Sequence, residues 1–100
     1  MSLRFDPEGH ETEALFALLP EWERARVLEI GCGDGRLTLR YARRAAHVVA
    51  IDPDEDDIRT ARGQLPPDLT GRVDYRAETL EGFRSRPDER FDIALLSWSL

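Results

Sequence analysis

The most informative part of the chain is VLEIGCGDGRLT at positions 27–38. Residues 27–30 are a short β-prone run, and glycines then stand at every second position, Gly31, Gly33 and Gly35. Such glycines permit a tight turn and let the backbone approach a ligand without a Cβ in the way. Residues 36–46 follow with apolar side chains at helical spacing. The stretch therefore predicts a strand, a glycine-rich turn and a helix, and the amides at the helix start favour a carboxylate or phosphate.

The rest of the chain continues this alternation of strands and helices. Further strands are expected at 47–51, 73–76 and 91–97, further helices at 10–19 and 54–64, and a short helix before the last strand. Strands that alternate with helices predict a parallel α/β sheet with right-handed crossovers. Residues 1–9 are polar and contain Pro7 and Gly9, so we expect them to be a mobile lead-in.

Composition indicates one soluble globular domain over residues 1–100, because 41% of the residues are hydrophobic and 34% are charged. The apolar runs are far shorter than the roughly 20 residues of a membrane-spanning helix, and no secretory leader opens the chain. We therefore expect a cytoplasmic protein without a membrane partner. The net charge of −6 argues against a nucleic-acid partner. The lone cysteine, Cys32, excludes an internal disulfide and a multi-cysteine metal site, and no metal is expected.

Two acidic residues follow the next two predicted strands at the points where they end. Asp52 comes 21 residues after Gly31, and its two carboxylate oxygens can accept from both hydroxyls of a ribose. The other interpretation of Asp52 is a helix N-cap ahead of Pro53. Glu78, followed by Thr79, can accept from the exocyclic amine of an adenine; alternatively it is an acid that complements a helix dipole. Because parallel strands end at the same edge, the pattern predicts a nucleoside-containing ligand in one crevice.

Two nucleoside cofactors are compatible with this pattern. The dinucleotide fingerprint GxGxxG requires a glycine where Arg36 stands. The chain instead has an acid two residues before the first glycine, in the pattern ExGxGxG. That acid, Glu29, is either a ligand contact or the partner of a nearby arginine. Cys32 is expected to be a small turn residue rather than a nucleophile, because no histidine stands near it in sequence.

With these residues the sequence resembles the class I (Rossmann-like) S-adenosylmethionine-dependent methyltransferases. The resemblance rests on VLEIGCGDGRLT at 27–38, VVAIDPDE at 48–55 and FDIALLSWSL at 91–100. It implies a Rossmann-like parallel sheet with flanking helices and four strands in the order 3-2-1-4, truncated relative to the seven-stranded methyltransferase fold. The later strands of that fold would be absent. The fourth strand would then be an exposed edge that favours self-association.

The resemblance also implies which residues hold S-adenosylmethionine. The glycine turn would line the methionine moiety, and the acid before it would lie near the amino group. Asp52 would hold the ribose, Pro53 would pack on the adenine, Glu78 and Thr79 would border its edge, and Ser97 would lie by the sulfonium. The implied cofactor-binding residues are Glu29, Gly31, Cys32, Gly33, Gly35, Asp52, Pro53, Glu78, Thr79 and Ser97.

The implied activity is methyl transfer to an unidentified small-molecule acceptor. Such a transfer is an in-line displacement, in which the protein mainly aligns the two reactants. No side chain stands out as a general base, so no catalytic residue is named. Two other functions stay open. One is a non-catalytic nucleotide-binding module, or a remnant that acts with a partner. The other is a dehydrogenase-type dinucleotide domain, which a preference for NAD would favour.

Overall fold

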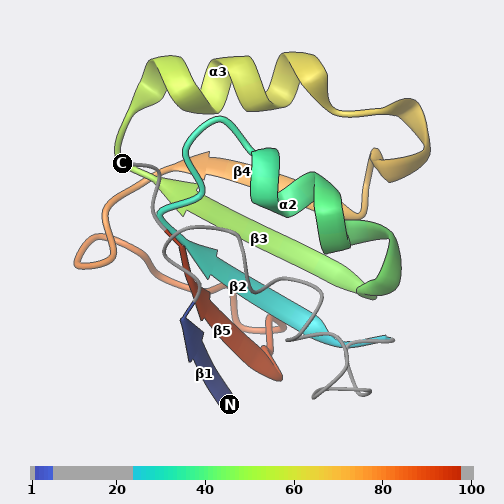
Figure 1. Ribbon diagram of the computed structural model, residues 1–100. Helices are drawn as coiled ribbons and strands as arrows, with labels where there is room; N and C mark the ends of the chain where they lie inside the picture. Colours follow the sequence, from blue (N-terminus) through green and yellow to red (C-terminus); the bar gives the residue numbers. More distant parts are fainter. Residues whose placement is uncertain (1, 6–23, 98–100) are drawn as a thin grey trace.

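A parallel sheet forms the centre of the molecule (Figure 1). The computed structural model describes residues 2–5 and 24–97. Five strands lie in the order β1-β5-β2-β3-β4. The order β4-β3-β2-β5 within this sheet confirms the predicted order 3-2-1-4. The strands are β1 (Ser2–Phe5), β2 (Arg26–Ile30), β3 (His47–Asp52), β4 (Val73–Ala77) and β5 (Ile93–Leu96).

Strand β1 departs from the sequence prediction of a mobile lead-in over residues 1–9. It pairs in parallel with β5, with Ser2 opposite Ile93 and Phe5 opposite Leu96. Since β5 also pairs with β2, the prediction that the fourth strand is an exposed edge is wrong. An exposed fourth strand therefore no longer supports self-association. So short a strand has little periodicity of its own, and its pairing depends on the backbone groups that β5 offers.

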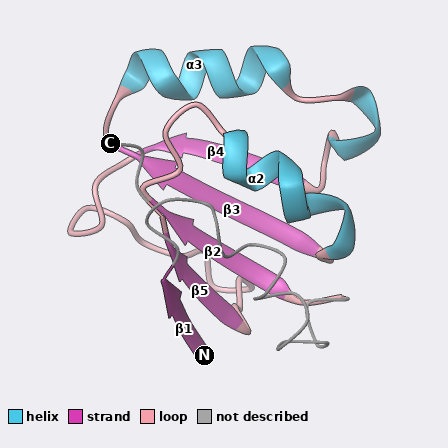
Figure 2. Cartoon of the chain, viewed as in Figure 1, coloured by secondary structure: helices cyan, strands magenta, loops and turns pink. Residues whose placement is uncertain are grey.

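Two α-helices lie on the same side of the sheet, α2 (Arg36–Tyr41) and α3 (Glu55–Gln64) (Figure 2). Helix α3 agrees with its prediction, and its N-cap Asp54 accepts hydrogen bonds from the amides of Asp56 and Asp57 at 2.9 and 3.0 Å. Helix α2 is shorter than the predicted 36–46. Its chain tightens into the 3₁₀ turn η2 (Ala42–Arg44) and then becomes extended, as it must to enter β3.

The remaining helix predictions have different outcomes. The helix predicted at 10–19 lies outside the described residues. The short helix predicted before the last strand is wrong, because residues 78–92 form turns and loops. Gly82 and Pro87 interrupt this segment. The second 3₁₀ turn, η3 (Pro67–Leu69), lies between α3 and β4. In the described part of the chain, no helix is both long and apolar enough to cross a bilayer.

Side chains are buried on both faces of the sheet, as expected for parallel strands. On the helix side, Val48 and Ala50 of β3 join a cluster with Ile58 and Ala61 of α3. On the other face, Val49 and Ile51 pack with Leu28, and Phe83 and Phe91 from the 78–92 segment cover them. The sheet is therefore fixed from both sides, and the loops at its carboxyl edge start from rigid strand ends.

Candidate functional site

The predicted site residues meet at the carboxyl ends of four neighbouring strands. The amide of Glu78, after β4, donates to the carbonyl of Asp52 at 3.1 Å. The amide of Gly33, after β2, donates to the Asp52 side chain at 3.0 Å. The amide of Ser97, after β5, donates to the carbonyl of Ile30 at 2.9 Å. These bonds connect the ends of β4, β3, β2 and β5 into one continuous edge, here called the carboxyl edge.

The glycine turn is tied to β3 by its backbone. The amides of Gly31 and Cys32 both donate to the carbonyl of Ile51, at 2.9 and 3.1 Å. All three glycines have positive φ. Gly35 is constrained by space as well, because at φ +88° a Cβ there would lie 2.5 Å from the Tyr75 hydroxyl. The turn thus requires glycine at this position both for backbone conformation and for space.

Asp52 lies at the centre of the carboxyl edge. One carboxylate oxygen accepts from the Gly33 amide and the other from the Asp54 amide at 2.9 Å. Each oxygen can accept a further hydrogen bond, and the side chain is partly exposed. The alternative interpretation of Asp52 as a helix N-cap is wrong, because Asp54 caps α3.

Glu78 offers a buried acceptor beside Asp52. Its Oε2 atom is buried and has no hydrogen-bond partner within the described part of the chain. The interpretation of Glu78 as an acid at a helix start is wrong, since no helix follows it. The neighbouring Thr79 is exposed, and its hydroxyl accepts from the amide of Gly82 at 3.0 Å. Pro53 is also exposed at this edge.

Glu29 lies beneath the glycine turn and is fully buried, with 0% of the residue exposed. The hydroxyls of Thr38, Tyr41 and Ser97 each donate to its carboxylate at 2.6 Å. These three contacts come from hydroxyl groups and not from an arginine. Burial and the adjacent Glu29 carboxylate raise the pKa of Tyr41 well above its usual range, so Tyr41 remains a donor.

Sequence analysis did not find Thr38 and Tyr41 as members of this cluster. A signal for them exists in the sequence, because two hydroxyl residues three positions apart share one face of a helix. This helix directly follows the turn that the acid precedes. Only the folded chain shows that the shared face points toward Glu29.

Cys32 is a buried residue of the turn with 5% exposure. Its thiol contacts the carbonyl of Gly33 at 3.6 Å. Burial, followed by the carboxylates of Glu29 and Asp52, raises the pKa of this thiol far above its usual range. These surroundings agree with the prediction of a turn residue and disfavour a thiolate nucleophile.

The carboxyl edge is strongly acidic. Desolvation, followed by the carboxylates of Asp54 and Asp52, raises the pKa of Asp57. A raised pKa from neighbouring carboxylates indicates a local negative potential. The acidic residues that gather here are Asp34, Asp52, Asp54, Asp56 and Asp57.

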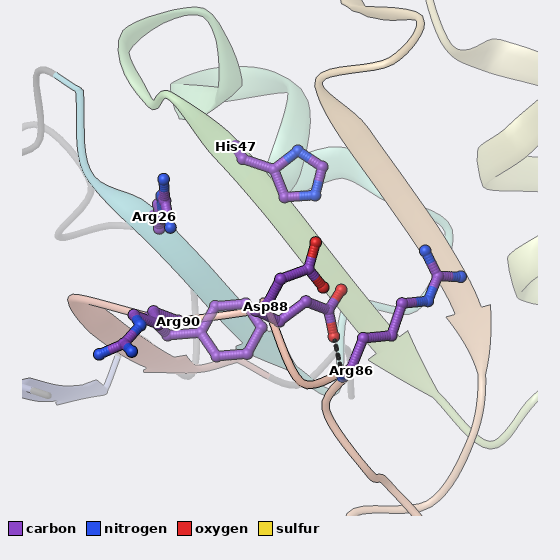
Figure 3. Close-up of a pocket in the computed structure, with 7 residues that line it drawn as sticks. Arg26, His47, Arg86, Asp88 and Arg90 are labelled. Carbon is purple, nitrogen blue, oxygen red and sulfur yellow. Dashed lines mark hydrogen bonds between the residues drawn. The ribbon is translucent and has the colours of Figure 1, made fainter.

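A separate hollow of about 310 Å³ lies at the amino ends of the strands, here called the amino edge (Figure 3). None of the predicted site residues lines it. The side chains of Arg26, Arg86 and Arg90 extend in different directions around it (Figure 3). The residues that line the hollow are Arg26, His47, Arg86, Asp88, Glu89, Arg90 and Phe91.

Residues 27–100 match a family model described as a methyltransferase domain. The chain is 39% identical over 71 residues to a magnesium-protoporphyrin O-methyltransferase of Rhodobacter capsulatus, a match that covers 68% of this chain and 32% of that protein. It is 36% identical over 74 residues to a mitochondrial ubiquinone biosynthesis O-methyltransferase of Homo sapiens, which covers 72% of this chain and 20% of the relative. The chain therefore spans about a third or less of the length of these relatives.

Solved structures show the same arrangement. An S-adenosylmethionine dependent methyltransferase from Mesorhizobium loti superposes with a TM-score of 0.69 at 29% identity, over 86% of this chain and 38% of that one. A methyltransferase from Geobacter sulfurreducens superposes with a TM-score of 0.56 at 29% identity, over 68% of this chain and 38% of that one.

Proposed function

The chain belongs to the methyltransferase-domain family, and we propose that it forms a single S-adenosylmethionine-binding domain of an enzyme that methylates a small molecule. The observation that carries the proposal is the continuous carboxyl edge, where the amide of Gly33 donates to the Asp52 carboxylate and the amide of Glu78 donates to the Asp52 carbonyl. Ligands of open parallel sheets bind at this edge.

The acceptors at this edge fit the nucleoside part of the ligand. The two oxygens of Asp52 each keep a free acceptor position, as the two hydroxyls of a ribose require. The buried Oε2 of Glu78 lacks a donor within the described residues, and the exocyclic amine of an adenine would supply one. A buried acceptor without a donor costs free energy, so this atom supports a ligand with an N–H at that place.

Charge favours S-adenosylmethionine over a dinucleotide. The acidic carboxyl edge would repel the pyrophosphate of NAD, whereas S-adenosylmethionine carries positive charge on its sulfonium and amino groups. The position after Gly35 also lacks the third glycine of the dinucleotide fingerprint. Both observations argue against the dehydrogenase alternative.

The bound cofactor supplies a methyl group on a positively charged sulfur. The chain itself binds and orients: Asp52 and Glu78 hold the nucleoside end, and the turn at Gly31–Gly35 leaves room beside the backbone for the rest. Orientation is the main requirement of an in-line displacement. No general base is assigned among these residues.

For the acceptor we propose an oxygen atom of a small molecule. Support comes from the relatives, whose names describe O-methyltransferases of ubiquinone biosynthesis and of magnesium-protoporphyrin. The proposed cytoplasmic location rests on the sequence expectation alone. A non-catalytic module is the second candidate, and it would bind the cofactor without methyl transfer.

Calorimetric titration of the chain with S-adenosylhomocysteine tests the proposal. We expect 1:1 binding, and we expect Asp52→Ala to weaken it by about 10- to 100-fold, since it removes hydrogen bonds to the ribose worth about 1–3 kcal/mol. Asp88→Ala is the matched control, because it removes the same charge from an exposed position at the amino edge of the sheet and should leave affinity nearly unchanged.

Two outcomes would contradict the proposal. Equal affinity in wild type and Asp52→Ala would show that the Asp52 carboxylate does not bind the ribose. Binding of NAD in preference to S-adenosylhomocysteine would favour the dinucleotide-binding alternative.

A further inference from the structure

We propose that Thr38, Tyr41 and Ser97 are positioning residues, which act through Glu29 to hold the glycine turn closed in its ligand-binding conformation. The inference rests on the proposed function, and it assigns these hydroxyls a role within the same site. None of the three needs to touch the reacting atoms.

The contacts of Glu29 join both ends of the turn. Glu29 is on β2 directly before the turn, whereas Thr38 and Tyr41 are on α2 directly after it. Their hydroxyls donate to the same carboxylate oxygen of Glu29, each at 2.6 Å. Residues 31–35 are thus a loop whose base is closed by side-chain hydrogen bonds.

Ser97 adds the neighbouring strand to this closure. Its hydroxyl donates to the second oxygen of Glu29 at 2.6 Å and lies 3.4 Å from the carbonyl of Gly31. One carboxylate therefore connects β2, α2 and the residue after β5. Opening of the turn would have to break these bonds.

Stability alone does not account for an acid at this position. Glu29 is fully buried on the sheet face where Val27 and Leu95 belong to the hydrophobic cluster. A buried carboxylate carries a large desolvation cost, and a well-packed apolar side chain is often at least as stabilising. Short hydrogen bonds to a charged acceptor are directional, so what the acid adds over an apolar residue is a fixed geometry.

The single cysteine of the chain provides a direct reporter of the turn. Cys32 lies inside the turn and is 5% exposed, so a neutral thiol reagent reacts only when the turn opens. The labelling rate measures this opening in the absence of any ligand. A low concentration of urea separates local opening from global unfolding, since only global unfolding exposes enough surface to respond steeply to urea.

We expect Tyr41→Phe to accelerate labelling of Cys32 by about ten-fold or more at a rate nearly independent of low urea, as a lost hydrogen bond to a charged group requires. Tyr75→Phe is the matched control. Tyr75 is also buried, at 2% exposure, but its hydroxyl has no hydrogen-bond partner among the described residues. Its removal should leave the labelling rate within about two-fold of wild type, since no hydrogen bond to Glu29 is lost.

A second pair of variants tests the same inference if Tyr41→Phe does not fold. Thr38→Val removes the hydroxyl at nearly constant shape and should accelerate labelling, whereas Thr38→Ser keeps the hydroxyl and should restore a rate near wild type. The inference would be overturned if Cys32 were labelled as slowly in Tyr41→Phe as in Tyr75→Phe, or as slowly in Thr38→Val as in Thr38→Ser. So would an acceleration that rises steeply with urea, since it would show a role in global stability only.

Titration of the same variants with S-adenosylhomocysteine separates the two proposals. If wild type binds, affinity should fall in the order in which labelling accelerates, and unchanged affinity in Tyr41→Phe would overturn the link to binding. If wild type does not bind, the proposed function fails for this chain, and the labelling rates still decide whether the hydroxyls close the turn.

Discussion

The two edges of the sheet differ in how their polar groups are held. At the carboxyl edge, the backbone amides of Gly33 and Glu78 donate to the carboxylate and to the carbonyl of Asp52. At the amino edge, the exposed side chains of Arg26 and Arg90 surround a hollow of about 310 Å³ and make no hydrogen bond or ion pair within the described part of the chain. A hollow alone does not identify a ligand site. Fixed acceptors at converging strand ends are what support the proposed site.

Two glycines, one at each edge of the sheet, differ in how tightly their surroundings are packed. Gly35 at the carboxyl edge has φ +88°, and Gly71 before β4 at the amino edge has φ +87°. A Cβ at Gly35 would lie 2.5 Å from the Tyr75 hydroxyl, whereas at Gly71 nothing lies within 4 Å. An added side chain would therefore meet the same backbone strain at both positions, and only at Gly35 would it also meet neighbouring atoms.

The largest effect is therefore expected for Gly35→Ala. It should lower the free energy of unfolding by about 2–4 kcal/mol, because left-handed strain and overpacking add. Gly71→Ala should lower it by only about 1–2 kcal/mol, from strain alone. Urea unfolding of both variants measures the difference. Equal losses would show that the turn at the carboxyl edge is no more tightly packed than the one at the amino edge.

An intermediate effect is expected for the ion pair that connects the two edges. Arg76, late in β4, pairs with Asp74 at 2.8 Å and with Glu89, which lines the amino-edge hollow. The hydrogen bonds from Arg76 lower the pKa of Glu89. The unfolded chain therefore takes up this proton at a higher pH than the folded chain does. The stabilisation is complete at neutral pH and is lost as pH falls below the ordinary carboxyl range of about 4.3.

Glu89→Gln should remove this part of the acid sensitivity. Urea unfolding at a series of pH values should show stability falling less steeply in the variant than in wild type below that range. Parallel curves would mean that Glu89 and Arg76 are not paired in solution.

The smallest effect is expected at the amino edge itself. Arg26→Ala combined with Arg90→Ala should change the affinity for S-adenosylhomocysteine by less than about two-fold, because exposed charges at the far edge are screened over such distances. Calorimetry on the double variant checks this. A larger loss would show that the amino edge contributes to the ligand site.

Much of the carboxyl edge can be predicted because local rules govern it. Alternating glycines after a β-prone run predict a turn with positive φ, and an acid at the end of the next strand predicts Asp52 beside it. The order of the four predicted strands came from the resemblance and is confirmed. The amino-edge hollow could not be predicted, because Arg26 and Phe91 meet there only after the strands have aligned.

The parallel α/β fold, the glycine turn and the positions of the acids that end the strands can be predicted from the sequence, because each depends on neighbouring residues. The partners of the buried groups, in contrast, depend on how the whole chain folds. The 2.6 Å bond from Ser97 to Glu29 spans 68 positions, and β1 lies beside β5 from the opposite end of the chain. Such contacts form because a buried carboxylate and an open strand edge must be satisfied by whichever group the folded chain brings near, and no local pattern records which group that is.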